Sequence, residues 1–191
     1  MTMTIVMGID PASTRLAFVA LHDHGGYLAQ KADNLAPRHG AKGQVLKTTK
    51  WSPVACGAAA TITAQYLGVL EESWPDEAIA AYIESPLVGR GGVRTTMVQS
   101  FTSGAVQGVL ANHGIPVTMV NVGTWKADVV GHGHATKDDV AEALRLRWPT
   151  FFSAAGGDQD LHDAACIALW GQEHLPDRGL GTTGSMPGAH R

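Results

Sequence analysis

Two apolar runs in the sequence each end in a single carboxylate, and this pattern limits the folds that the chain can adopt. The run "IVMGID" at residues 5–10 ends in Asp10, and "AIAAYIE" at residues 78–84 ends in Glu84. Short apolar runs of this kind are typical of buried strands. Asp10 precedes Pro11, which also suits a turn at a strand end, so one acid alone decides nothing. The repeated pattern predicts two buried strands that each carry a charge at their carboxyl end.

Strand and helix patterns alternate along the rest of the chain. Three strand patterns come first, and the glycines of "HDHGG" favour a tight hairpin between the second and the third. The expected strands cover residues 3–10, 15–23, 25–35, 78–86 and 115–122. The expected helices cover residues 53–73, 94–114, 136–148 and 160–175. This order predicts an α/β fold with a five-stranded mixed sheet, in which three antiparallel strands are joined by parallel strands and flanked by helices.

The predicted topology offers a place where several acids can meet. In an open α/β sheet, a site forms beside the carboxyl ends of the strands, where the strand order changes. Asp10 and Glu84 meet there if the first and fourth strands are neighbours. The last helix adds Asp160 and Asp163, which stand three residues apart and therefore share a helix face. Such carboxylates repel one another unless cations neutralise them, and Mg²⁺ prefers carboxylate oxygens, so the residues predict a Mg²⁺ site with Asp10 as one ligand.

Two residues near the start of the last helix leave part of this assignment open. Asp160 also suits the N-cap position, and Asp158 competes with it for the role of cap or of metal ligand. We favour Asp160 as the ligand because only Asp160 stands three residues before Asp163. His162 points away from the face that the two acids share, and its part in the metal site stays open.

Length and composition indicate one domain. The 191 residues are 45% hydrophobic, which is enough to bury a core. We expect the domain to cover residues 1–175, and residues 176–191 to be a disordered tail because they show no apolar periodicity. No apolar run reaches the roughly 20 residues of a membrane span, and the N-terminus lacks the features of a signal peptide. The expectation is a cytoplasmic protein without a membrane partner.

Basic residues are concentrated in two stretches that contain no acid, although the formal net charge is −3. Residues 34–70 and 85–127 hold neither Asp nor Glu. The DNA contacts predicted in these stretches are Arg38, Lys42, Lys47, Lys50, Arg90 and Arg94. A solvated side chain is the alternative for each of them singly, but their grouping among Gly, Ser and Thr favours a nucleic-acid surface.

Four motifs resemble those of a known family. "GIDPAS" at residues 8–13 is similar to the first-strand motif GIDPGS, and "YIESP" at residues 82–86 resembles the strand of the second carboxylate. "DLHDAACIAL" at residues 160–169 resembles the closing helix, and "WKADVVGHGHATKDDV" at residues 125–140 resembles a segment with two lysines. In this order and spacing, over residues 4–172, the chain resembles the RuvC-type Holliday junction resolvases of the RNase H-like superfamily.

The resemblance implies a fold, an activity and a set of site residues. The fold would be RNase H-like, and the activity would be cleavage of branched DNA, above all Holliday junctions, with two metal ions and by a homodimer. The implied ligands of Mg²⁺, for which Mn²⁺ would substitute, are the catalytic acids Asp10, Glu84, Asp160 and Asp163. Lys126 and Lys137 would contact DNA, and Lys137 would also assist catalysis.

Other features leave the substrate open. Ala12 stands where the motif has Gly. The loop before the first helix is long and basic. Loops around a common nuclease core decide which DNA shape is held. A general nuclease for forks and flaps is therefore the alternative. A non-cleaving DNA-binding module fits less well because all four acids are present, and an actin-like phosphotransferase needs two such domains, which 191 residues cannot hold. Trp125 is interpreted as a packing residue, with base stacking as its alternative role.

Overall fold

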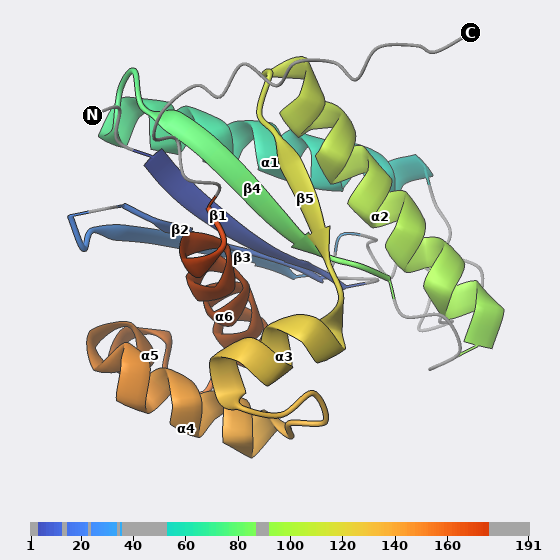
Figure 1. The fold of residues 1–191 in the computed structure, drawn as a ribbon. Coiled ribbons are helices and arrows are strands. Elements are labelled where there is room, and N and C mark those ends of the chain that lie inside the picture. Colours follow the sequence, from blue (N-terminus) through green and yellow to red (C-terminus); the bar gives the residue numbers. More distant parts are fainter. Residues whose placement is uncertain are drawn as a thin grey trace, which may run out of the picture.

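Five strands form one mixed sheet at the centre of the computed structural model (Figure 1). The strands are β1 (Thr4–Pro11), β2 (Arg15–Leu21), β3 (Tyr27–Asp33), β4 (Ala78–Glu84) and β5 (Val117–Val120). Their order across the sheet is β3-β2-β1-β4-β5. The pairs β1–β2 and β2–β3 are antiparallel, whereas β1–β4 and β4–β5 are parallel. The predicted sheet is therefore confirmed.

Six helices complete the part of the chain that the structure describes, namely residues 4–12, 15–22, 24–33, 35, 53–86 and 92–175. The helices are α1 (Pro53–Ser73), α2 (Gly92–Asn112), α3 (Val122–Val130), α4 (Lys137–Arg147), α5 (Pro149–Ala155) and α6 (Gln159–Glu173). α1 and α2 cover one face of the sheet, and α6 covers the other, with α3, α4 and α5 packed around it (Figure 1). The expected tail at residues 176–191 lies outside the described residues. None of the described helices is long and apolar enough to cross a membrane.

The alternation of side chains along the strands produces two separate cores. Successive strand residues point to opposite faces of a sheet. Ile5 and Met7 of β1 pack with α1 and α2, whereas Val6 between them packs with α6. In β4, Ile83 belongs to the first core and Tyr82 to the second. Because both faces are covered, the central strands are continuous apolar runs rather than alternating ones.

Two helices lie where the sequence predicts none. α3 follows Asn121, whose Oδ1 accepts a hydrogen bond from the Gly123 backbone N–H at 2.8 Å, and ends at Gly131, whose φ is 104°. α5 begins at Pro149 and ends before Gly156, whose φ is 60°. Asn at an N-cap, Pro at the first helical position and Gly after the last one are helix signals. The two helices escape prediction because nine and seven residues give too little apolar periodicity.

α6 crosses β1 at very close range, and Gly8 makes this possible. A Cβ atom at position 8 would lie 2.1 Å from the Ala164 carbonyl oxygen and 2.4 Å from the Ala168 backbone nitrogen. Side chains do not fit at such distances from a backbone, so only Gly is compatible with this packing. Ala164 and Ala168 are themselves small and fully buried. The contact holds the N-terminal turns of α6 close to the carboxyl end of β1.

We expect Gly8→Ala to destabilise the fold, because the added methyl group meets backbone atoms of α6. Overpacking a core commonly costs about 1–3 kcal/mol, and a clash with backbone belongs at the upper end of that range. Urea unfolding followed by circular dichroism measures the free energy of unfolding. The matched control is Gly57→Ala on α1, where the position is exposed and the space around a Cβ is open. That change should leave stability equal or higher. A Gly8→Ala variant as stable as the unmodified protein would contradict the close contact.

Candidate active site

The carboxyl ends of β1 and β4 bring Asp10 and Glu84 together. Ile9 of β1 is the register partner of Ile83 of β4, so the acids that follow them occupy neighbouring positions on adjacent strands. The alternation along each strand directs both carboxylates to the face that α6 covers. The prediction that these two acids stand on adjacent strands is therefore confirmed.

The acids of α6 complete a group of four carboxylates. Burial raises the pKa of Asp10 well above its usual value, and repulsion from Glu84, Asp163 and Asp160 raises it further. Burial also raises the pKa of Glu84 to about 7 and shifts the pKa of Asp163 upward. Repulsion of this kind arises between carboxylates that lie close to one another. The structure thus brings acids from β4 and α6 within electrostatic reach of Asp10 on β1, and their roles as metal ligands stay a prediction.

Two of the four carboxylates are held by neutral donors. The Trp125 indole Nε1 donates a hydrogen bond to Glu84 Oε2 at 2.9 Å, and Trp125 is completely buried. Gln159 Nε2 donates to Asp163 Oδ1 at 3.0 Å. Trp125 is therefore a packing residue that also orients Glu84, and its buried ring offers no surface on which a base stacks. The sequence contains one signal for this role, since a buried Trp needs an acceptor for its N–H.

The start of α6 separates the roles of Asp158 and Asp160. Asp158 is the N-cap, because its Oδ1 accepts hydrogen bonds from the backbone N–H groups of Asp160 and Leu161 at 3.1 and 3.2 Å. Asp160 has no capping role, and its carboxylate turns to two cations. Asp160 Oδ2 lies 3.0 Å from Arg15 Nη1 and 2.9 Å from Lys31 Nζ. The sequence gives no signal for these contacts, because β2 and β3 are distant from α6 along the chain.

Lys126 and Lys137 lie within electrostatic reach of the acids. Lys126 Nζ donates a hydrogen bond to the Ala135 carbonyl oxygen at 2.8 Å. Lys137 is the first residue of α4, directly after the N-cap Thr136. Burial raises the pKa of Asp163. The hydrogen bond from Gln159, and then the charges of Lys126 and Lys137, lower it. The structure therefore brings both predicted lysines to the same site as the acids.

His162 packs against α5. Its ring stacks on Phe152 with 5.2 Å between the ring centroids, and its Nε2 lies 2.9 Å from the Gly156 carbonyl oxygen. The residue is almost completely buried, with 2% of its surface exposed. These contacts assign His162 a packing role between α5 and α6.

Most of the DNA contacts predicted from the basic stretches lie outside the described residues. These are Arg38, Lys42, Lys47, Lys50 and Arg90. Arg94 belongs to the first turn of α2, of which the structure describes the backbone but not this side chain. Their contribution to DNA binding stays a prediction from the sequence.

The chemistry of the donor set suits Mg²⁺. Carboxylate oxygens are the ligands that Mg²⁺ favours, and buried acids that repel one another are stabilised by a cation between them. In the described parts of the chain, no three acid, imidazole or thiol side chains are arranged as a ready metal cluster. Three of the four carboxylates are turned to neighbouring protein groups instead, Glu84 to an indole, Asp163 to an amide and Asp160 to two cations. These protein groups fix the orientations of the three side chains.

We expect Asp10→Asn to raise the stability of the metal-free protein. Because burial and repulsion raise the pKa of Asp10 in the folded state, its charged form destabilises the fold above the unfolded-state pKa, which includes neutral pH. The free energy of unfolding should therefore rise, because the amide carries no charge to be desolvated or repelled. Urea unfolding at pH 7 with a chelator measures it. Glu72→Gln, at an exposed position on α1, is the control and should change little. A less stable Asp10→Asn variant would contradict repulsion within the cluster.

The sheet order, the acids at the ends of β1 and β4 and the covering helix with two more acids define an RNase H-like domain. The chain is 28% identical over 169 residues to the crossover junction endodeoxyribonuclease RuvC of Ruegeria pomeroyi, covering 86% of this chain and 88% of the relative. It is 25% identical over 164 residues to RuvC of Rickettsia massiliae, covering 86% and 94%. No family model matches the chain.

Solved structures lead to the same group. The structure of Thermus thermophilus RuvC matches with a TM-score of 0.57 and 28% identity, over 86% of this chain and 91% of that chain. A second Thermus thermophilus RuvC structure, in complex with a Holliday junction substrate, has the same fold, with a TM-score of 0.54 and 24% identity over 88% and 92%. The chain is RuvC-like in sequence and in fold, which confirms the resemblance that the four motifs indicate.

Proposed function

We propose that this chain is an endonuclease that cuts Holliday junctions by metal-dependent hydrolysis of phosphodiester bonds. One observation carries the proposal: acids from β1, β4 and α6 converge in a chain whose sequence and fold are RuvC-like. The curated relatives are named crossover junction endodeoxyribonucleases, which gives the substrate class. A protein that acts on DNA works in the compartment that holds DNA, and a cytoplasmic location is part of this proposal.

Two Mg²⁺ ions, for which Mn²⁺ would substitute, are the proposed cofactors. Their ligands would be Asp10, Glu84, Asp160 and Asp163. When bound, the ions supply an activated water and stabilise the charge on the scissile phosphate and the leaving 3′ oxygen. The residues around the acids prepare the site, since Trp125 orients Glu84 and Gln159 orients Asp163. Burial beneath α6 limits the access of water to the carboxylates, which strengthens their attraction for cations.

Lys126 and Lys137 are the proposed phosphate contacts next to the scissile bond. Their charges act on the acids of the site, so a phosphate that approaches those acids also meets two ammonium groups. Lys137 would assist catalysis by stabilising the negative charge that develops on the phosphate. The proposed DNA surface extends from these lysines over the basic stretches, with Arg38, Lys42, Lys47, Lys50, Arg90 and Arg94.

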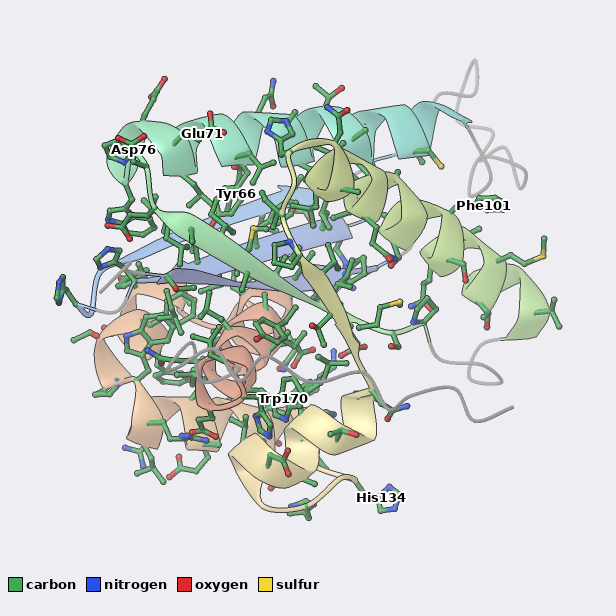
Figure 2. The ribbon with its side chains drawn as sticks, turned by 45° about the horizontal axis from the view of Figure 1, so that its top comes forward. Tyr66, Glu71, Asp76, Phe101, His134 and Trp170 are labelled. Carbon is green, nitrogen blue, oxygen red and sulfur yellow. The ribbon has the colours of Figure 1, made fainter. Side chains whose placement is uncertain are left out.

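A homodimer is the proposed form of the active protein. A four-way junction has two equivalent strands to cut and one site reaches only one of them, so a symmetric pair of subunits is the economical solution. α2 carries an apolar stripe that suits such a contact, because Val93, Met97 and Phe101 stand four residues apart and are 78%, 41% and 49% exposed. Figure 2 shows Phe101 on α2, projecting away from the sheet. Val93 and Met97 of this stripe are the side chains that the proposed contact would use.

We expect Asp10→Asn, Glu84→Gln and Asp163→Asn each to abolish cleavage while DNA binding survives. The amides keep the size of the acids and remove the charge that holds a metal ion. Binding should tighten, because the phosphate is repelled less. Denaturing gels of labelled junctions measure cleavage, and mobility shifts in Ca²⁺ or a chelator measure binding. Glu72→Gln, exposed on α1, should cleave normally. Cleavage retained in Asp10→Asn would refute the assignment.

The choice of substrate separates the proposal from its alternative, a general nuclease for forks and flaps. A panel of synthetic four-way junctions, replication forks, flaps and linear duplexes, incubated with Mg²⁺ or Mn²⁺, decides between them. Paired and symmetric nicks across the four-way junction are expected, with little cutting of the duplex. Equal cutting of forks and flaps, with single nicks in the junction, would favour the alternative.

We expect Val93→Glu combined with Met97→Glu to convert the dimer into a monomer. Two charges on the exposed stripe of α2 would repel the same charges on a second copy. Light scattering measures the mass in solution, and circular dichroism checks that the variant folds. The monomer should lose paired nicking of junctions. An unmodified protein that is monomeric at micromolar concentration and still makes paired nicks would contradict the proposed assembly.

A further inference from the structure

Lys31 reaches the candidate active site from β3, two strands away from Asp10. Asp10 is the register partner of Ala17, and Ala17 is the partner of Lys31, so the three residues form one row across β1, β2 and β3. Register partners present their side chains on the same face of a sheet, which here is the face that α6 covers. Adjacent strands are about 4.8 Å apart, and the long side chain of Lys31 bridges the distance to the start of α6.

Two cations converge on one oxygen of Asp160. Lys31 Nζ lies 2.9 Å from Asp160 Oδ2, and it also lies 2.7 Å from Asp158 Oδ2 and 3.7 Å from Asp33 Oδ1. The Lys31 side chain is only 19% exposed. Arg15 Nη1 lies 3.0 Å from the same Asp160 oxygen, and the Arg15 side chain is 48% exposed. Asp160 is therefore already paired with positive charge inside the protein.

Asp160 differs in this respect from the other acids of the site. Glu84 and Asp163 accept hydrogen bonds from an indole and an amide, and both donors are neutral. Within the described ranges of the chain, Asp160 is the only one of the four acids that forms an ion pair. A divalent ion that used Asp160 would come next to two positive charges and would have to displace them. If the ion pair between Lys31 and Asp160 breaks, the Lys31 ammonium group still has a charged partner, because it donates a hydrogen bond to Asp158 Oδ2.

We propose that Lys31 is a positioning residue that serves as the internal counter-cation of Asp160 and competes there with a divalent ion. The inference rests on the proposed function, because it requires the acids to bind metal. The ion position formed by Asp10, Glu84 and Asp163 then fills first. The ion position that uses Asp160 fills at a higher metal concentration. The positive charges of Lys31 and Arg15 determine the difference between the two dissociation constants.

Titration of the full chain with Mn²⁺ in the absence of DNA tests the proposal. Electron paramagnetic resonance counts the bound ions, and isothermal titration calorimetry gives the two dissociation constants. Lys31→Met keeps the length of the side chain and removes its charge. We expect the weaker dissociation constant to fall by about tenfold in this variant, and the tighter one to stay within about threefold. A weaker constant that is unchanged or higher in Lys31→Met would overturn the proposal.

Three further variants make the test specific. Lys31→Arg keeps a cation and should retain the weak second site. Arg15→Gln changes a half-exposed residue, so folding is not at risk, and it should tighten the second site in the same direction as Lys31→Met. Arg145→Gln removes the same charge from an exposed pair with Glu142 on α4 and should leave both constants unchanged. If Lys31→Met does not fold, an unchanged second site in Arg15→Gln overturns the proposal.

Thermal stability provides a second readout, and cleavage identifies which idea fails. Without Lys31, Asp158 loses its cation and Asp160 keeps only Arg15, so metal-free Lys31→Met should melt at a lower temperature. Mn²⁺ should then raise its melting temperature more than that of the unmodified protein. If the unmodified protein binds no Mn²⁺ and cuts no junction, the proposed function fails. If it binds two ions and cuts normally while Lys31→Met behaves identically, only the role of Lys31 is refuted.

Discussion

The close approach of α6 to the sheet is the contact on which the site depends. Gly8 on β1 admits the α6 backbone, and Gly171 near the other end of α6 leaves room for the Tyr82 ring of β4, which would lie 2.3 Å from a Cβ. These two contacts fix α6 over β1 and β4. Because the N-terminal turns of α6 lie at the carboxyl ends of those strands, the acids of the helix meet the acids of the sheet. The position of the α6 acids relative to Asp10 and Glu84 thus depends on two glycines, Gly8 and Gly171.

The site concentrates negative charge in a partly buried place, and its neighbours compensate for that charge in different ways. Glu84 and Asp163 receive neutral hydrogen bonds, and Asp160 is paired with cations. Burial and then repulsion from Glu84, Asp163 and Asp160 raise the pKa of Asp10 well above its usual value. An arrangement of this kind lowers the stability of the fold, as is common where function requires strained or repelling groups. In the proposed function, the same repulsion would favour the binding of a cation.

Local patterns in the sequence were sufficient to predict the strands, the long helices and the positions of the acids. Apolar runs and helical spacing depend on neighbours within a few residues, so Asp10, Glu84 and Asp163 could be assigned to one site before any contact was known. The partners of these acids could not be predicted. Trp125 meets Glu84 across 41 residues, and Lys31 meets Asp158 across 127 residues. Such pairs depend on strand register and on how closely a helix packs, which no local pattern specifies.

The short helix α3, which no periodicity predicts, connects the acids to the lysines. Its residues Trp125 and Lys126 are adjacent in sequence and have different partners. The Trp125 indole donates a hydrogen bond to Glu84, and the Lys126 ammonium group donates one to the Ala135 carbonyl oxygen. The same ammonium group lies 5.5 Å from the centre of the indole ring. Ala135 immediately precedes the N-cap of α4, whose first residue is Lys137. One helix therefore sets the orientation of an acid from β4 and the position of Lys126, and it is hydrogen-bonded to the segment that leads into Lys137. A chain with the same four acids but without α3 would lack the hydrogen bond that orients Glu84 and the hydrogen bond that holds Lys126. The segment from Trp125 to Val140 is for that reason as informative about the site as the acids themselves.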